Sequence, residues 1–172
     1  MPDIIFSLLA KKKGIDIHSD LQMRFFDTYK EALDDLTAGG SQFAVLPEPY
    51  ASVATLKGAY RSLDLQDVWA DLTGNLPRYP QAGVIISAGF DQFSLDLLEQ
   101  VLRESLEWMV NSPDESGELG AKLLGVESLA IISSLKESRW QSVNASAARS
   151  ELENFFILLR EHSPSLLKDG LP

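Results

Sequence analysis

Apolar residues recur along the chain at helical spacing over several long stretches. Ile4 and Ile5 are followed by Leu8 and Leu9, which places all four on one face of a helix. The same three-to-four-residue spacing continues in seven later stretches, several of them bounded by capping residues or glycine stops. Helices are therefore predicted at residues 2–12, 28–39, 49–58, 65–72, 94–109, 112–125, 128–136 and 145–161.

Shorter apolar runs between these stretches predict strands. Leu21, Met23 and Phe25 alternate with polar residues, as expected for a strand with one polar face. The runs 43–46 and 83–87 are short and almost wholly apolar, which favours buried strands, and residues 60–63 are expected to form a further short strand. A strand, a helix ending at glycine and a second strand form a right-handed crossover, so the strands should pair in parallel. The expected fold class is α/β.

A segment rich in turn-forming residues, 74–80, predicts a division of the chain. Residues 1–79 are expected to form a small lobe around a mostly parallel sheet. Residues 80–172 are expected to contribute one strand and about four helices. One strand cannot cover four apolar helix faces, and soluble proteins avoid large exposed apolar patches. We therefore expect a homo-oligomer or a further N-terminal segment to cover these helices.

An acidic residue between two prolines is the most informative local motif. Pro47 cannot donate a hydrogen bond to a sheet, so the strand 43–46 must end there. Pro49 suits the start of a helix. Glu48 is then held at the carboxyl end of a strand and the amino end of a helix, where α/β proteins bind ligands and helix N–H groups favour anions. An equally open interpretation is that Glu48 only caps the helix.

The stretch Leu46–Ser52, with Ala32–Gly40 before it, resembles the second lobe of substrate-binding proteins of ABC importers for nitrate, sulfonate, taurine and thiamine precursors. Residues 2–6 and 84–87 extend the resemblance in both directions. It covers nearly the whole chain, but only the C-terminal half to two-thirds of such a protein. The resemblance implies a periplasmic-binding-protein type II fold, in which residues 1–79 are the second lobe and residues 80–172 return to the first.

The resemblance also implies a function and a site. The chain would be the solute-binding component, or a fragment of it, that captures a small organic or anionic ligand between two lobes and delivers it to a transporter permease. Ligand-binding positions would be Glu48, Tyr50 and Tyr79, with Asn75 as a weaker candidate. A full-length parent would be periplasmic or lipid-anchored outside the cell, although the present N-terminus lacks the pattern of an export signal.

Composition narrows the chemistry. The net charge of −10 argues against nucleic acid and anionic membrane surfaces as partners. With no cysteine, the chain has no disulfide, thiolate metal site or catalytic thiol. His18 and His162 lie far from any matching carboxylate or serine in the sequence, so both are expected at the surface. We expect no catalytic residue, no metal and no cofactor.

Two other functions stay open at this level. One is a cytoplasmic ligand-sensing module, and the other is an enzyme that converts a bound precursor on the same fold. The enzyme would need a titrating residue in the cleft, and Glu48 is the only good candidate. The tryptophans are interpreted as structural: Trp69 as a core residue, and Trp108 and Trp140 as part of the helical block.

Overall fold

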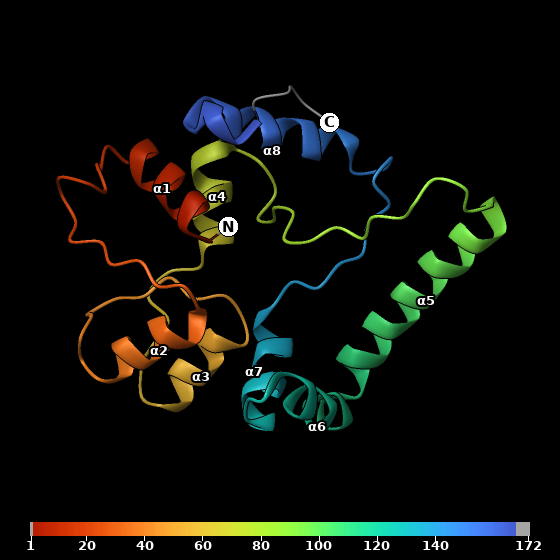
Figure 1. The fold of residues 1–172 in the computed structure, drawn as a ribbon, viewed down its shortest axis with the longest axis horizontal. Helices are drawn as coiled ribbons and strands as arrows, with labels where there is room; N and C mark the ends of the chain where they lie inside the picture. Colours follow the sequence, from red (N-terminus) through yellow and green to blue (C-terminus); the bar gives the residue numbers. More distant parts are fainter. Residues whose placement is uncertain (1, 168–172) are drawn as a thin grey trace.

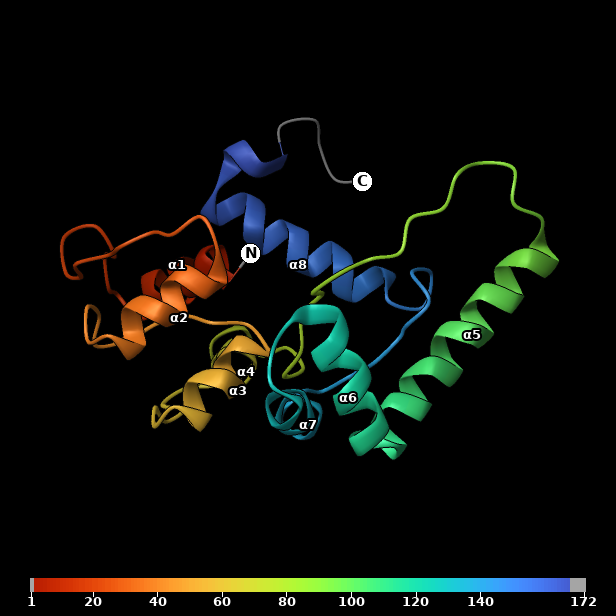
Figure 2. The same ribbon diagram turned by 60° about the horizontal axis from the view of Figure 1, so that its bottom comes forward.

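The computed structural model describes residues 2–167, and within them all regular structure is helical. Figures 1 and 2 show long connections on both sides of α5–α7, whereas α5, α6 and α7 follow one another closely. The helices are α1 (Pro2–Lys12), α2 (Tyr29–Thr37), α3 (Tyr50–Leu56), α4 (Leu65–Thr73), α5 (Gln92–Asn111), α6 (Pro113–Leu124), α7 (Ser128–Glu137) and α8 (Arg149–His162), followed by the short 3-10 helix η1 (Pro164–Leu167). No described helix is long and apolar enough to cross a membrane.

The predicted α/β fold with a parallel sheet lobe is wrong, and with it the assignment to the type II binding-protein fold. Residues 21–25, 43–46, 60–63 and 83–87 form no strand in the described chain. Residues 22–26 and 43–46 adopt no regular structure, and none of them forms a backbone–backbone hydrogen bond with another segment. Strand-like residues give a strand only when a second segment lies alongside to accept and donate these bonds. The sequence pattern identifies the apolar runs, but it does not show whether a second segment lies beside each run to pair with it.

Several helix ends follow directly from the sequence. Thr28 caps α2 through a complete capping box with Glu31: each side chain accepts a hydrogen bond from the other residue's backbone N–H. Pro113 opens α6 as predicted, and Gly125 closes it with φ of 68°. The cap of α5 is Asp91, whose carboxylate accepts a bond from the Ser94 N–H, so this helix begins two residues before the predicted range 94–109.

The first apolar cluster joins α1, α4 and α8. Its central side chain is Trp69, which is 2% exposed, so the interpretation of this residue as core is confirmed. The Trp69 ring lies 5.6 Å from Phe155 and 5.7 Å from Tyr79. The buried members of this cluster are Ile5, Leu8, Leu9, Trp69, Phe155 and Leu159. It therefore contains residues from both 1–79 and 80–172, and the division between these ranges stays a prediction.

The second apolar cluster joins α2 and α3 to α7. Leu33, Val53, Ala54 and Ala130 are its buried members. Next to it, α6 and α7 pack closely because α6 presents glycines to α7. A Cβ at Gly117 would lie 2.7 Å from Ile132 Cγ1, closer than real Cβ contacts allow. This close packing of α6 on α7 forms the floor of the candidate site.

The long helix α5 is different from the others. None of its residues is buried, and apolar side chains along it, such as Phe93, Leu97 and Val101, are exposed. Figure 1 shows α5 at one edge of the molecule, with an extended connection leading to it from α4. Other apolar side chains of α5 are half-buried, so this helix is only partly covered; they are Leu95, Leu98, Leu102, Leu106 and Met109.

Candidate functional site

Glu48 occupies the turn before α3, and a cis peptide bond joins it to Pro49. Its Oε2 accepts a hydrogen bond from the Ser52 N–H at 3.2 Å, so Glu48 does cap the helix. Its Oε1 lies 2.5 Å from Arg61 Nη2, in an ion pair whose carboxylate side chain is 18% exposed. Arg61 also donates to the buried Ser52 hydroxyl at 2.9 Å. Glu48 is thus fixed by two partners.

The structure does not bring the other three predicted site residues together with Glu48 around one cavity. Tyr50 packs on Tyr29, with ring centroids 5.9 Å apart. Tyr79 stacks on Phe155 in the first apolar cluster, and burial raises the pKa of its hydroxyl. Asn75 is exposed, and its backbone N–H donates to the Thr73 hydroxyl. These contacts are structural ones.

Glu48 and Pro49 do border a cavity of about 220 Å³ where the end of α5 meets α6 and α7. Its wall is mostly apolar, with Trp108 and Trp140 among the lining residues. The Ser116 hydroxyl is buried, lines this cavity and has no hydrogen-bond partner within residues 2–167. A buried hydroxyl without a partner carries a desolvation cost that a bound polar group would relieve.

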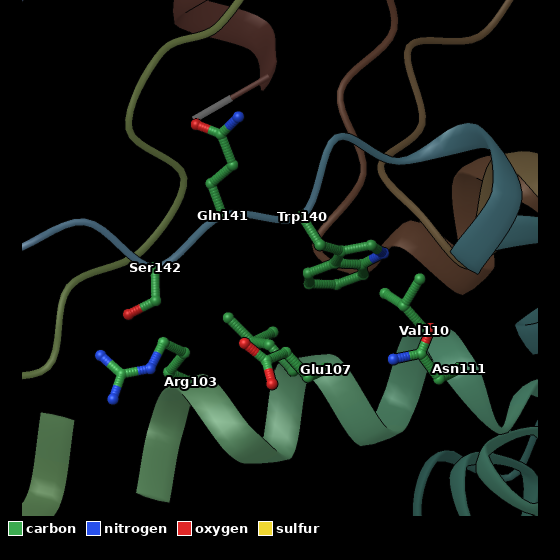
Figure 3. Close-up of a pocket in the computed structure, with 8 residues that line it drawn as sticks. Arg103, Glu107, Val110, Asn111, Trp140, Gln141 and Ser142 are labelled. Atoms are coloured by element: carbon green, nitrogen blue, oxygen red, sulfur yellow. The ribbon is translucent and has the colours of Figure 1, made fainter. Parts of the chain in front are cut away.

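A second hollow of about 360 Å³ lies on the other side of Trp140, between α5 and residues 140–142. Figure 3 shows the Trp140 indole above the turns of α5 that carry Glu107, Val110 and Asn111. The Gln141 side chain points away from α5, and its Oε1 accepts a bond from Arg78 Nη1 at 2.5 Å. Because Trp140 lines both hollows, we call them together the tryptophan cleft.

One wall of the tryptophan cleft carries uncommitted polar groups. Arg103, Glu107 and Asn111 follow one another at intervals of four residues on α5, so they share one face of the helix. Within the described chain, none of the three side chains forms an ion pair or a side-chain hydrogen bond. A cation, an anion and an amide without partners thus line one hollow together with an aromatic ring. Small-molecule sites combine an apolar or aromatic wall with a few polar groups in this way.

Neither histidine of the chain lines this cleft. His18 is exposed, and the His162 ring lies at the junction of α8 and α1, 3.1 Å from the Ser7 hydroxyl. Among residues 2–167 no group of histidines and carboxylates is placed to hold a metal ion. The chemistry that the cleft itself offers is ion pairing, hydrogen bonding and contact with indole rings.

Sequence reasoning found Glu48 but missed most of the cleft. Trp108 and Trp140 were expected to be structural, yet they are 42% and 45% exposed and line cavities. The available signal was the stripe Arg103, Glu107 and Asn111 beside apolar residues on one helix. Such a stripe of polar residues usually marks the face of a helix that contacts solvent. It indicates a binding site only when the structure shows that Trp140 lies next to it.

Comparisons with protein-family models, with curated proteins and with solved structures find no match to this chain. The resemblance to importer substrate-binding proteins therefore stays a prediction.

Proposed function

We propose that this protein is a solute-binding protein that captures a small zwitterionic solute in the tryptophan cleft. The observation that carries the proposal is the set of unpartnered groups on α5, Arg103, Glu107 and Asn111, which line one hollow together with the exposed indole of Trp140. Capture for an ABC-type importer rests only on the resemblance of Leu46–Ser52 to importer proteins, and would place the protein outside the cytoplasmic membrane. The cleft argues for binding rather than turnover, because its groups are suited to hold charge.

The spacing of the charged groups indicates the class of solute. Residues four apart on a helix carry side chains about 6 Å apart at their bases. Arg103 can form paired hydrogen bonds with a sulfonate or carboxylate, and Glu107 can accept from an ammonium group. An ammonium group in this position can also lie against the Trp140 ring, which attracts cations. A short amino-sulfonate or amino acid carries both charges at a matching separation.

Isothermal titration with 2-aminoethanesulfonate (taurine) tests this proposal. Ethanesulfonate lacks the ammonium group and ethylamine lacks the sulfonate, so each should bind at least about tenfold more weakly, a difference of about 1.4 kcal/mol. The variants Arg103→Gln and Trp140→Ala should weaken taurine binding by a similar factor. Arg149→Gln, which removes an exposed charge from α8, should leave it unchanged.

Two outcomes would contradict the proposal. One is an equal affinity for taurine, ethanesulfonate and ethylamine, because a site that reads both charges must distinguish them. The other is binding that survives both Arg103→Gln and Trp140→Ala, since the solute would then lie elsewhere. Loss of binding in these variants counts only if far-UV circular dichroism shows unchanged helix content.

A further inference from the structure

The connection between α4 and α5 contains an apolar segment that touches little else. All residues from 81 to 90 are exposed, and Ile85 is 95% exposed. Val84 and Phe90 are also more than half exposed. Residues 81–87 adopt no regular structure and form no backbone–backbone hydrogen bond within the described chain. Figures 1 and 2 show this segment as a bare stretch of chain leading to α5.

The molecule as a whole also exposes more surface than its size requires. Its accessible surface is 11852 Å² for a chain of 19.0 kDa. A folded monomer of this mass is expected to expose roughly 8,400 Å², so the excess is roughly 3,400 Å². A standard protein interface takes about 800 Å² from each partner. The excess is therefore large enough to supply the interface of a stable dimer several times over.

We propose that residues 83–87 pair with the same residues of a second copy of this chain, as antiparallel strands around a two-fold axis through Ile85. In this register Val84 lies opposite Ile86, and Gly83 lies opposite Ser87. Branched apolar residues then face one another, and small residues face small ones. The segment is thus complementary to itself, as an interface between identical copies requires. The unpaired backbone groups of each copy supply the hydrogen bonds of the other.

Charge and sequence favour this segment over the other extended ones. The chain carries a net charge of −10, yet residues 80–90 contain no charged residue, so pairing brings no carboxylates together. In residues 22–26, Arg24 is already bound to Asp35 at 2.7 Å. Residues 43–46 end at Pro47, which cannot donate to a strand. Because α5 begins directly after residues 83–90, its exposed apolar side chains would be carried into the same interface.

Light scattering coupled to size exclusion tests the proposal at micromolar concentration. The full chain should have twice the mass of one 19.0 kDa chain. Ile85→Lys places two lysines opposite each other and removes two buried isoleucines, so the dissociation constant should rise at least about a hundredfold. Leu129→Lys is the matched control, because Leu129 is an exposed leucine on α7; this variant should remain a dimer. Circular dichroism should give the same helix content for all three proteins.

A cysteine placed on the axis tests the register. Since the natural chain has no cysteine, Ile85→Cys should form a disulfide-linked dimer on mild oxidation, whereas Lys12→Cys should not. A monomeric natural chain would overturn the proposal, as would open-ended aggregation. A dimer that Ile85→Lys leaves intact, or in which Ile85→Cys and Lys12→Cys cross-link equally, would overturn it as well. The proposal would also be overturned if the chain is a monomer and residues 83–87 pair with a strand of a different protein.

Discussion

At the scale of single residues, Glu48 is held by more contacts than a helix cap requires. One carboxylate oxygen accepts from the backbone of α3, and the other pairs with Arg61, which also satisfies the buried Ser52 hydroxyl. Glu48 and Pro49 line the cavity beside Trp108 and Trp140. Arg61 is therefore the side chain that fixes this corner of the tryptophan cleft.

Replacing Arg61 with alanine should destabilise the protein by about 1–3 kcal/mol, because the Glu48 carboxylate and the Ser52 hydroxyl both lose a partner in a poorly hydrated place. Urea denaturation followed by circular dichroism measures this change. Arg149→Ala is the matched control: Arg149 pairs with Glu153 on the surface of α8 and is 80% exposed. Its removal should cost less than about 0.5 kcal/mol. Equal losses in the two variants would contradict the role assigned to Arg61.

The pH dependence of stability should depend on His162. Its ring is half-buried against α1, and burial lowers its pKa below the usual value. The unfolded chain therefore binds this proton more readily than the folded one, and stability is lost as the pH falls below about 6.5. The free energy of unfolding should decline more between pH 7 and pH 5 in the natural protein than in His162→Gln.

His18→Gln is the control for this prediction, because the His18 side chain is exposed. This variant should retain the pH dependence of the natural protein. If the free energy of unfolding declines equally between pH 7 and pH 5 in all three proteins, the pH dependence does not come from His162.

At the scale of elements, the sequence predicts the helices well and the strands wrongly. Helix α1 spans the predicted residues 2–12, and Gly125 ends α6 at the boundary predicted for the helix 112–125. These features are local, since a helix satisfies its own backbone hydrogen bonds. A strand depends on a second segment, and the short apolar run at 43–46 finds none in the described chain. Phe43 is accordingly 76% exposed.

In the candidate site, too, features set by local sequence could be predicted and features set by long-range packing could not. Glu48 could be predicted because prolines on both sides fix its backbone setting, and it does line a cavity. Tyr79 could not be separated from a core aromatic by sequence, because its ring packs on Phe155 from a helix far along the chain. Trp140 acquires its role only from the turns of α5 beneath it. Long-range packing of this kind leaves no periodic signal.

The contact between α6 and α7 yields a prediction about Gly117. A Cβ at this position would lie 2.7 Å from Ile132 Cγ1 and 2.8 Å from Ser128 Oγ. Gly117→Ala should therefore destabilise the protein by about 1–3 kcal/mol through overpacking, even though alanine favours a helix by about 1 kcal/mol. Thermal denaturation measures the change. Glu118→Ala is the control, because Glu118 is an exposed residue of the same helix; a Gly117→Ala variant as stable as the natural protein would contradict the packing.

At the scale of the whole molecule, the structure consists of two apolar clusters with a long helix that stands beside them. The clusters account for the burial of α1, α4 and α8 and of α2, α3 and α7. Helix α5 has no buried residue but provides the polar wall of the tryptophan cleft. The proposed pairing of residues 83–87 would anchor the start of α5, and the variants Ile85→Lys and Trp140→Ala test dimer formation and solute binding separately.

The central claim is that a small zwitterion binds at Trp140. Its most direct test is the nuclear magnetic resonance spectrum of the indole N–H groups of Trp69, Trp108 and Trp140, with the Trp140 signal assigned from its loss in Trp140→Phe. Titration with taurine should shift the Trp140 signal in a saturable way and leave that of the buried Trp69 unchanged. A titration in which the Trp140 signal does not move, or in which Trp69 moves equally, would contradict the claim.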